Sequence, residues 1–539
     1  MTSPHFASEP YFDVHLHPAP ADVVKEFDTW VTMRDGIKLC ANVFRPQKPG
    51  KYPVIMSTTP YGKNNFNEYE YFEKNIPRVH VGHIEISDIV GIESPDPGFW
   101  VPNGYVVMHV DTRGQGKSEG KTGPFSRKDE EDYYDLIEWA GTQQWSNGNV
   151  ALNGVSYLAM SQWGVASRNP PHLKAIVPWE GVYDHYRWAY FGGILETGFR
   201  PWIWHQWIVP RHNKTCGYYE DNWPENAAKH PVIDEYWRPY AYELEKITVP
   251  TLICASFSDQ GLHSRDSFHA YTRISSRYKW LFNHRRQKWS VYYSEEAVAF
   301  QKRFLDHFLK GIDNGMLDVP RVRLEINQSR TEYKVLHAND WPLQQTRYIP
   351  LFLDARTRSL KPFAFPQESS ISYASDGSEA AVFDLKFEHD TDVVGDTKLR
   401  LWVSTEEGDD MDLFVGLKKL DANGDEVFFY GSPGFNPNDI VARGWLRVSH
   451  RELDPEKSRP WMPCLKHERT LKIKPGEIVP VDIEVLPHGT TFKKGETLRL
   501  VVQGASIDHL LIKLETLNKG RHRIYTGGRF DSHLLVPIV

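Results

Sequence analysis

Apolar positions recur with two different spacings along the chain, and the spacing changes near residue 348. Between about residues 30 and 310, short apolar runs alternate with stretches of helical periodicity, which predicts a mainly parallel sheet covered by helices on both faces. The predicted strands are 54–56, 106–110, 150–152, 175–177, 252–255 and 280–282. After Ser126, apolar residues recur at i, i+3, i+4 and i+7 from Tyr133 to Ala140, which predicts a helix crossing over the sheet.

Two segments depart from this alternation. Residues 179–245 carry seven Trp among many Tyr, and we interpret them as an inserted helical cap. From about residue 348 onward, strands such as 399–403 and 498–502 alternate apolar and polar positions between Gly, Asp, Asn and Pro turns, which predicts an all-β sandwich. The predicted organisation is an α/β domain of residues 1–178 and 246–347, the cap of 179–245, and a C-terminal β-sandwich of 348–539.

The composition argues against several classes of partner. The net charge is −7 over 539 residues, and the sequence has no run of Lys or Arg. This charge pattern predicts no basic surface that would bind nucleic acid or an anionic membrane. No window reaches the roughly 18 apolar residues of a membrane helix, and the N-terminus lacks the features of a signal peptide, so we expect a soluble, cytoplasmic protein. Aromatic residues make up 13% of the chain, which suits large cores and apolar pockets. The oligomeric state is open, with a homo-oligomer as one alternative.

One short segment has the context of a catalytic serine. Asn153-Gly154-Val155-Ser156-Tyr157-Leu158-Ala159 follows a predicted strand and precedes a helical run, as a nucleophile elbow does. Gly154 lets strand and helix approach closely, whereas Leu158 stands where the G-x-S-x-G pattern has its second glycine. The segment predicts a nucleophile at Ser156, which needs an imidazole to take its proton and a carboxylate to orient that imidazole.

Candidates for both partners follow later in the chain. The chain order in this fold class is serine, acid, histidine. One predicted strand leads into Asp259 and the next leads into His284, so both lie beyond C-terminal strand ends, where active sites of open α/β sheets gather. His263 and His269 are rivals for the base. His263 is only four residues after Asp259 and is expected to share its helix or loop, while the last strand should supply the base.

Three other motifs suggest bound groups and are set aside. Gly116-Lys117-Ser118 is similar to part of a phosphate-binding loop, but Asp111 stands where the first glycine is required. Asp13-Val14-His15-Leu16-His17 is similar to the metal-binding start of barrel amidohydrolases, but the later ligands have no obvious place. His80-Val81-Gly82-His83 gives no stronger sign of a metal. We therefore expect no metal and no cofactor.

Several longer motifs follow one another along the chain in a characteristic order. They are Met33-Arg34-Asp35-Gly36, Thr59-Pro60-Tyr61-Gly62-Lys63, the glycine-rich segment 111–120, Gln144-Trp145-Ser146-Asn147-Gly148, Gly154-Val155-Ser156-Tyr157, the segment 444–451 and Tyr525-Thr526-Gly527-Gly528. Over nearly its full length the chain resembles the cocaine esterase and X-Pro dipeptidyl-peptidase group of serine hydrolases, the CocE/NonD family. The resemblance implies an α/β-hydrolase fold with a helical cap insertion and a C-terminal jelly-roll β-sandwich domain.

The resemblance also implies roles for individual residues. Ser156 would be the nucleophile, Asp259 the orienting acid and His284 the general base. The Tyr61 hydroxyl and the backbone N–H of Tyr157 would form the oxyanion hole, where each well-aimed donor is worth about 3 kcal/mol. The chain departs from the family at Asn283-His284-Arg285-Arg286-Gln287-Lys288-Trp289, where the better-known members carry a Gly-Pro-Trp-x-His type of loop.

The predicted activity is cleavage of an ester or amide bond through an acyl-enzyme, in a small molecule or short peptide with a bulky apolar or aromatic group. The alternatives are an X-Pro dipeptidyl-peptidase, an acyltransferase or cyclase that uses the same acyl-enzyme, and a non-catalytic binding protein on the same fold. Candidate pocket walls from the cap are Trp179, Trp188, Tyr190, Trp204 and Trp207. Candidate acceptors for a substrate amine are Glu180, Asp184 and Glu196.

Overall fold

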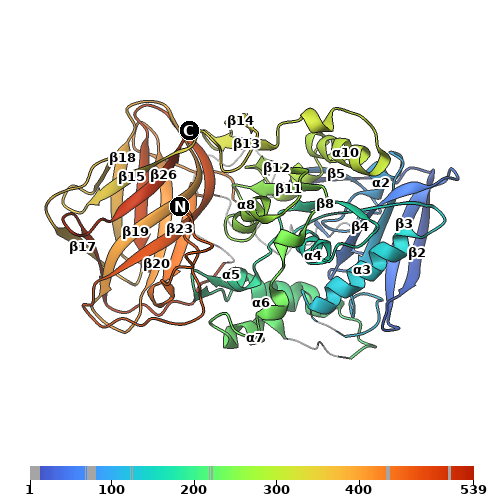
Figure 1. Cartoon of the computed structure of the whole chain (residues 1–539), viewed down its shortest axis with the longest axis horizontal. Helices are drawn as coiled ribbons and strands as arrows, with labels where there is room; N and C mark the ends of the chain where they lie inside the picture. Colours follow the sequence, from blue (N-terminus) through green and yellow to red (C-terminus); the bar gives the residue numbers. More distant parts are fainter. Residues whose placement is uncertain are drawn as a thin grey trace.

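The computed structural model describes residues 12–66, 68–69, 81–121, 123, 125–217, 219, 222–431, 438–507 and 512–539. Figure 1 shows two bodies side by side, a mixed part of helices and strands and a strand-rich part formed by the orange and red C-terminal segments. Within the described ranges, no helix combines the length and the apolar character needed to cross a membrane.

A large sheet forms the centre of the mixed part. In spatial order its strands are β2 (Val23–Thr32), β3 (Lys38–Pro46), β6 (Val106–Asp111), β4 (Tyr52–Thr59), β7 (Ser146–Val155), β8 (Leu173–Trp179), β11 (Thr251–Ser256), β12 (Lys279–His284), β13 (Val322–Asn327) and β14 (Tyr333–Ala338). Neighbours from β6 to β13 are parallel, and the remaining strands add antiparallel edges. The six predicted strands lie within β4, β6, β7, β8, β11 and β12, so the mainly parallel sheet is confirmed.

Helices cover both faces of this sheet, as predicted. On one face lie α3 (Arg127–Gly141), α4 (Tyr157–Ala166) and α8 (Ser264–Arg273), and on the other lies α10 (Glu295–Lys310). The short helices α2 (Pro97–Trp100) and α9 (Lys288–Tyr292) belong to the same part of the chain. The predicted helix after Ser126 is α3, because the Ser126 hydroxyl accepts a hydrogen bond from the Asp129 N–H at 3.2 Å and caps its first turn.

Residues 179–245 form short elements rich in buried aromatic rings. They are α5 (His185–Ala189), β9 (Tyr190–Phe191), β10 (Ile194–Leu195), α6 (Phe199–Ile203), the π-helix η1 (Trp204–Ile208), η2 (Val209–Arg211), α7 (Trp223–Lys229), η3 (Arg238–Tyr240) and η4 (Leu244–Lys246). Trp188 stacks on Trp223 with ring centroids 5.1 Å apart. Trp207 meets Tyr61, just beyond β4, edge to face at 5.6 Å. These rings therefore connect the segment to the C-terminal edge of the sheet.

The C-terminal part consists of strands around one apolar core. They are β15 (Arg347–Asp354), β16 (Ser359–Lys361), β17 (Ser369–Ala374), β18 (Ala380–Lys386), β19 (Thr391–Thr405), β20 (Asp412–Leu420), β21 (Glu426–Val427), β22 (Ala442–Arg447), β23 (Val479–Phe492), β24 (Thr497–Gln503), β25 (Arg521–Thr526) and β26 (His533–Ile538). Alternate residues such as Leu399, Leu401 and Val403 point into the core. The predicted strands 399–403 and 498–502 lie within β19 and β24, which confirms a β-rich C-terminal domain.

Two features outside the large sheet bear on function. β1 (Phe12–His17) and β5 (Gly82–Ser87) form a separate two-stranded parallel sheet. The Gln260 side chain, in the loop after β11, donates a hydrogen bond to the Val441 carbonyl of the C-terminal part at 2.8 Å. The C-terminal part therefore contacts the loop that carries Asp259.

Candidate active site

Ser156 occupies a sharp turn between β7 and α4. Its backbone has φ 58° and ψ −118°, a left-handed conformation that is unusual for a residue with a side chain. The Ser156 N–H donates to the Trp179 carbonyl of β8 at 3.1 Å, which fixes the turn against the neighbouring strand. A Cβ atom at Gly154 would lie 2.5 Å from the Leu158 Cβ. Glycine is thus required two residues before the serine, because Leu158 fills the space on the helix side.

The Ser156 hydroxyl meets the imidazole of His263. Its Oγ lies 3.3 Å from His263 Nε2, and the other ring nitrogen, Nδ1, bonds to Asp259 Oδ2. Both His263 and Asp259 are buried, with side chains 2% and 1% exposed. When His263 carries its proton on Nδ1, that nitrogen donates to the carboxylate and Nε2 is free to accept the serine proton. The order serine, imidazole, carboxylate is the arrangement that activates a serine nucleophile.

The structure corrects the placement of His284, which was expected to be the base. His284 is fully buried, and its Nε2 bonds to Glu180 Oε1 at 2.8 Å, while its ring stacks on Trp179. Burial lowers the pKa of His284 to about 3, so it stays neutral and is a poor proton acceptor. The other rival, His269, lies on α8 and its Nε2 is 3.4 Å from Asp396 Oδ1. The serine contact thus comes from His263.

The segment after β12, which was expected to supply the base, contacts Asp259 through a lysine. Lys288 Nζ lies 3.5 Å from Asp259 Oδ2, the same oxygen that bonds to His263. The Lys288 side chain is 5% exposed. The nearby carboxylates Asp259, Glu180 and Glu93 raise the pKa of Lys288 against the opposing effect of burial, so a positive charge is held beside the imidazole and the serine.

Two candidate donors lie near Ser156, the Tyr61 hydroxyl and the Tyr157 backbone N–H. Tyr61 lines the same pocket as Ser156, and burial raises the pKa of Tyr61 well above its usual range, so the phenol keeps its proton. Tyr157 is the first residue of α4, and its backbone N–H has no acceptor within the helix, as in any first turn. The Tyr157 hydroxyl points elsewhere and lies 3.2 Å from Asp129 Oδ2. Only the backbone of Tyr157 is therefore placed beside Ser156.

A pocket opens over Ser156. Its other lining residues are Tyr61, Ile92, Glu93, Phe199, Trp202, Ile203, Trp207, Leu262, Lys288 and Trp289. The walls are mainly apolar and aromatic, with Glu93 and Lys288 as the charged members. Such a pocket suits a bulky apolar group beside a small number of polar contacts.

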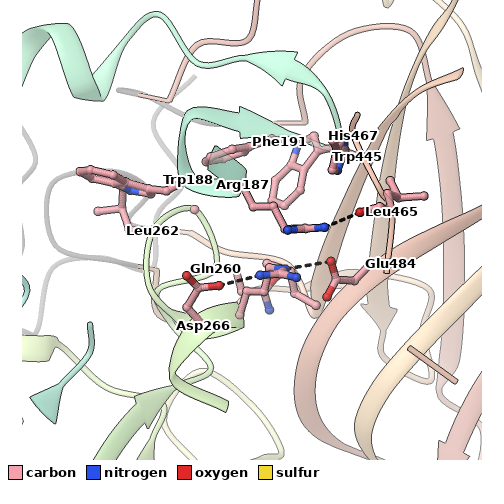
Figure 2. Close-up of a pocket in the computed structure, with 14 residues that line it drawn as sticks. Arg187, Trp188, Phe191, Gln260, Leu262, Asp266, Trp445, Leu465, His467 and Glu484 are labelled. Carbon is pink, nitrogen blue, oxygen red and sulfur yellow. Dashed lines mark hydrogen bonds and ion pairs between the residues drawn. The ribbon is translucent and has the colours of Figure 1, made fainter. Parts of the chain in front are cut away.

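Among the five predicted wall residues, Trp207 lines this pocket. Trp188 lines a neighbouring pocket, shown in Figure 2, with Arg187, Phe191 and Trp445. Leu262, next to His263, borders both pockets. The other three predicted wall residues are buried elsewhere. Trp179 packs against Phe282 and Tyr292, and Trp204 packs against Tyr219. The Tyr190 hydroxyl donates a hydrogen bond to the Ala227 carbonyl. Sequence reasoning missed Phe199, Trp202 and Ile203 of α6.

The carboxylates predicted to receive a substrate amine are engaged with protein groups. Glu180 Oε2 accepts a hydrogen bond from the Ser256 hydroxyl at 2.8 Å, Asp184 pairs with Arg187, and Glu196 pairs with Arg200. Burial raises the pKa of Glu180 to about 8, and the negative charge of Asp259 acts in the same direction. None of these three carboxylates is among the residues described as lining the pocket over Ser156.

Glu93 is the carboxylate that does line the pocket. Its Oε1 accepts a hydrogen bond from Trp289 Nε1 at 3.0 Å, and its backbone carbonyl accepts one from the Val155 N–H at 3.0 Å, next to the serine. Burial raises the pKa of Glu93 to about 7. Nothing in the pattern of the sequence distinguished this glutamate, because its place depends on the long segment between β4 and β6 folding back over the elbow.

Comparisons with known proteins place the chain in a family. Residues 35–287 match the family model of X-Pro dipeptidyl-peptidase (S15 family), and residues 314–535 match that of the X-Pro dipeptidyl-peptidase C-terminal non-catalytic domain. The cocaine esterase of Rhodococcus sp. is 28% identical over 386 residues, which cover 60% of this chain and 61% of that enzyme. A putative Xaa-Pro dipeptidyl-peptidase of Bacillus cereus is 23% identical over 534 residues, covering 89% of this chain and 84% of that protein.

One solved structure is similar over almost the whole chain. The crystal structure of a CocE/NonD family hydrolase from Staphylococcus aureus is 45% identical, with a TM-score of 0.91, and the match covers 96% of this chain and 94% of that one. Serine hydrolase is the class that the fold, the serine turn and these similarities define. The chain belongs to the CocE/NonD family of hydrolases.

Proposed function

We propose that this hydrolase cleaves an ester or amide bond through an acyl-enzyme on Ser156, with His263 as general base and Asp259 as the acid that orients it. The observation that carries the proposal is the continuous contact from Ser156 Oγ to His263 Nε2 and from His263 Nδ1 to Asp259 Oδ2. Ser156 attacks the substrate carbonyl while its proton moves to His263 Nε2. His263 then donates this proton to the leaving group, and water hydrolyses the acyl-enzyme by the same steps.

The tetrahedral intermediate places a negative charge on the former carbonyl oxygen. The Tyr61 hydroxyl and the Tyr157 backbone N–H are the donors proposed to stabilise it, and each is worth about 3 kcal/mol when aimed at the oxyanion. The position of Tyr61 supports this role, because Tyr61 lines the pocket over Ser156 and its buried phenol keeps its proton. Lys288 adds a positive charge near Asp259 and compensates for several buried carboxylates.

The pocket supports a substrate with a bulky apolar or aromatic group. Phe199, Trp202 and Ile203 of α6 and Trp207 of η1 form its outer wall. We assign residues 179–245 as the helical cap over an α/β-hydrolase domain of residues 1–178 and 246–347. Residues 348–539 are assigned as a jelly-roll domain, which braces the loop of Asp259 through Gln260. The similarity to a cocaine esterase is consistent with an aromatic ester as substrate.

A fluorophosphonate probe tests the proposed nucleophile. The folded protein should form one covalent adduct, located by peptide mass spectrometry at Ser156, and the labelled protein should lose its turnover of aromatic esters. Ser156→Ala should take up no probe, whereas Ser161→Ala, which removes a hydroxyl five residues further along the chain in α4, should label normally. Labelling that persists in Ser156→Ala would remove Ser156 from the proposal.

Glu93 supports a second candidate, a peptidase that requires a free amine on its substrate. Glu93 lines the pocket over Ser156 and could pair with a substrate ammonium group. The similarity to Xaa-Pro dipeptidyl-peptidases points the same way. Hydrolysis rates of an aminoacyl-prolyl amide and of its N-acetylated form separate the two candidates. A strong preference for the free amine that is lost in Glu93→Gln favours the peptidase, and equal rates favour the esterase or amidase.

A further inference from the structure

Away from the serine pocket, metal-binding types of side chain gather on one face of the small β1–β5 sheet. The two strands pair in parallel with Asp13 beside His83 and His15 beside Glu85. Since successive side chains in a strand point to opposite faces, Asp13, His15 and His17 share one face with His83 and Glu85. The register thus brings together two motifs that are far apart in the sequence.

The other face of this sheet is turned to the interior. Ile84 and Ile86 are 1% and 2% exposed, and Val14 packs against the same apolar cluster. The side chains of His15 and His83 are 53% and 58% exposed. The face that carries the imidazoles is therefore open to ions from solution.

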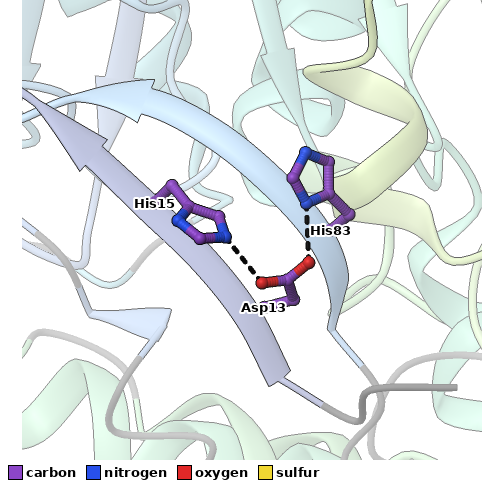
Figure 3. Close-up of side chains that lie close together, drawn as sticks. All are labelled: Asp13, His15 and His83. Carbon is purple, nitrogen blue, oxygen red and sulfur yellow. Dashed lines mark hydrogen bonds and ion pairs between the residues drawn. The ribbon is translucent and has the colours of Figure 1, made fainter.

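Asp13 lies between the two imidazoles, as Figure 3 shows. Its Oδ1 is 2.6 Å from His15 Nε2, and its Oδ2 is 2.7 Å from His83 Nδ1. One nitrogen of each ring and one oxygen of Asp13 all lie within 4.8 Å of one another. Zinc binds imidazole nitrogen and carboxylate oxygen at about 2.0–2.2 Å, so two ligands of one ion lie at most about 4.4 Å apart. Small rotations of these exposed side chains suffice to reach that spacing.

Glu85 completes the surroundings of this cluster. Its Oε1 lies 3.4 Å from His83 Nε2, the ring nitrogen that does not face Asp13, and its Oε2 lies 3.9 Å from His17 Nε2. A histidine that binds a metal through one ring nitrogen commonly donates the other N–H to a carboxylate, which fixes the ring and makes it a better ligand. Glu85 is in the position for that partner.

We propose that Asp13, His15 and His83 form a surface site for a divalent transition metal ion, with Zn²⁺ as the ion that the donor set fits well. Imidazole nitrogen with carboxylate oxygen suits Zn²⁺, Ni²⁺ or Cu²⁺ better than Mg²⁺ or Ca²⁺. Three protein ligands on an open face leave a coordination position for water. The motif around Asp13 supplies two of the proposed ligands, Asp13 and His15, and the fold supplies the third, His83, from β5. A bound ion would link β1 to β5.

Metal titration of the full chain tests this site. Zn²⁺ binding is measured by calorimetry, and Co²⁺ is used as a spectroscopic substitute whose visible absorption reports the ligands. We expect one ion per chain, bound at least about tenfold more weakly by the double variant His15→Ala/His83→Ala. The matched control His337→Ala/His389→Ala removes two exposed imidazoles elsewhere and should bind like the parent protein.

The active-site cluster of Glu180, Asp259 and His263 also offers three ligand atoms within 4.8 Å, so it needs its own control. His263→Ala should retain the ion, and the ion should raise the melting temperature of the parent, of His263→Ala and of His337→Ala/His389→Ala but not of His15→Ala/His83→Ala. The proposal is overturned if the double variant binds as tightly as the parent, if only His263→Ala loses the ion, or if the parent binds none. The last result would leave Asp13, His15 and His83 as a surface hydrogen-bond network.

Discussion

His263 and Asp259 lie four residues apart in the turn that leads into α8, and this spacing joins the imidazole to the carboxylate. The His263 N–H donates to the Asp259 carbonyl at 3.1 Å, as in a helical turn. Residues i and i+4 of such a turn lie on one face, so His263 Nδ1 meets Asp259 Oδ2. The acid and the proposed base therefore come from a single short segment, which Gln260 ties to the C-terminal part.

Removal of the Tyr61 hydroxyl is expected to slow catalysis without unfolding the protein. Tyr61→Phe deletes one proposed oxyanion donor, and kcat for an aromatic ester should fall by a factor on the order of 10² to 10³ with little change in KM. Tyr133→Phe is the matched control, because it removes a buried hydroxyl that donates to the Met56 carbonyl on the opposite face of the sheet. An unchanged kcat in Tyr61→Phe would show that the phenol only packs against Trp207.

The elbow is expected to tolerate no side chain at Gly154. In Gly154→Ala the new Cβ would lie 2.5 Å from the Leu158 Cβ, and overpacking of this kind costs about 1–3 kcal/mol of unfolding free energy. Leu158→Gly alone removes the Leu158 Cβ, leaves a cavity and also destabilises. The double variant Gly154→Ala/Leu158→Gly should lose less stability than the sum of the two single losses, because the Cβ that causes the clash is absent. Simple additivity in denaturant titrations would contradict the proposed contact.

Buried carboxyl groups are expected to make the protein less stable as the pH rises. Burial raises the pKa of Glu180 to about 8, that of Asp129 to about 8 and that of Glu93 to about 7. In the unfolded chain a glutamate titrates near about 4.3. Above that pH the folded protein still holds protons that the unfolded chain has released. The contribution of these carboxyl groups to the unfolding free energy is therefore fully present below pH about 4 and is lost as the pH rises through about 8.

Glu180→Gln isolates one part of this pH dependence. Glutamine mimics the protonated carboxyl, so the fall in unfolding free energy between pH about 6 and about 9 should shrink by more than about 1 kcal/mol. Glu295→Gln, an exposed glutamate at the start of α10, should leave the fall unchanged. Denaturant titrations at the two pH values give the comparison. Equal falls in Glu180→Gln and the parent protein would show that Glu180 is ionised in the folded state.

The sheet and the serine turn were predictable because they depend on local patterns. Apolar runs of strand length mark β4, β6, β7, β8, β11 and β12, and a small residue before Ser156 marks the elbow. Asp259 follows a strand end, as expected for open α/β sheets. The histidine that contacts Ser156 was not chosen from the sequence, because a position after the last strand was weighted above the i, i+4 spacing. That spacing from Asp259 was visible in the sequence and is the signal that points to His263, the proposed base.

The pocket walls depend on tertiary packing that no local pattern encodes. Trp204 and Trp207 both belong to the π-helix η1, yet Trp207 faces Tyr61 and Trp204 faces Tyr219. The widened π-helical turn changes which side chains share a face. Glu93 enters the pocket through a segment of irregular backbone with a positive φ of 62°. Aromatic richness predicted a pocket near residues 179–245 but could not separate wall residues from core residues.

The assignment of the base is tested most directly by the rate at which two histidine variants form the Ser156 adduct and turn over an aromatic ester. His263→Ala removes the imidazole 3.3 Å from Ser156 Oγ, and kcat/KM should fall by a factor on the order of 10² to 10⁴. His284→Gln keeps an amide donor for Glu180 and should retain kcat/KM within about tenfold, provided that its melting temperature shows a folded protein. A folded His263→Ala with near-parent activity, beside a folded but inactive His284→Gln, would contradict the proposed triad.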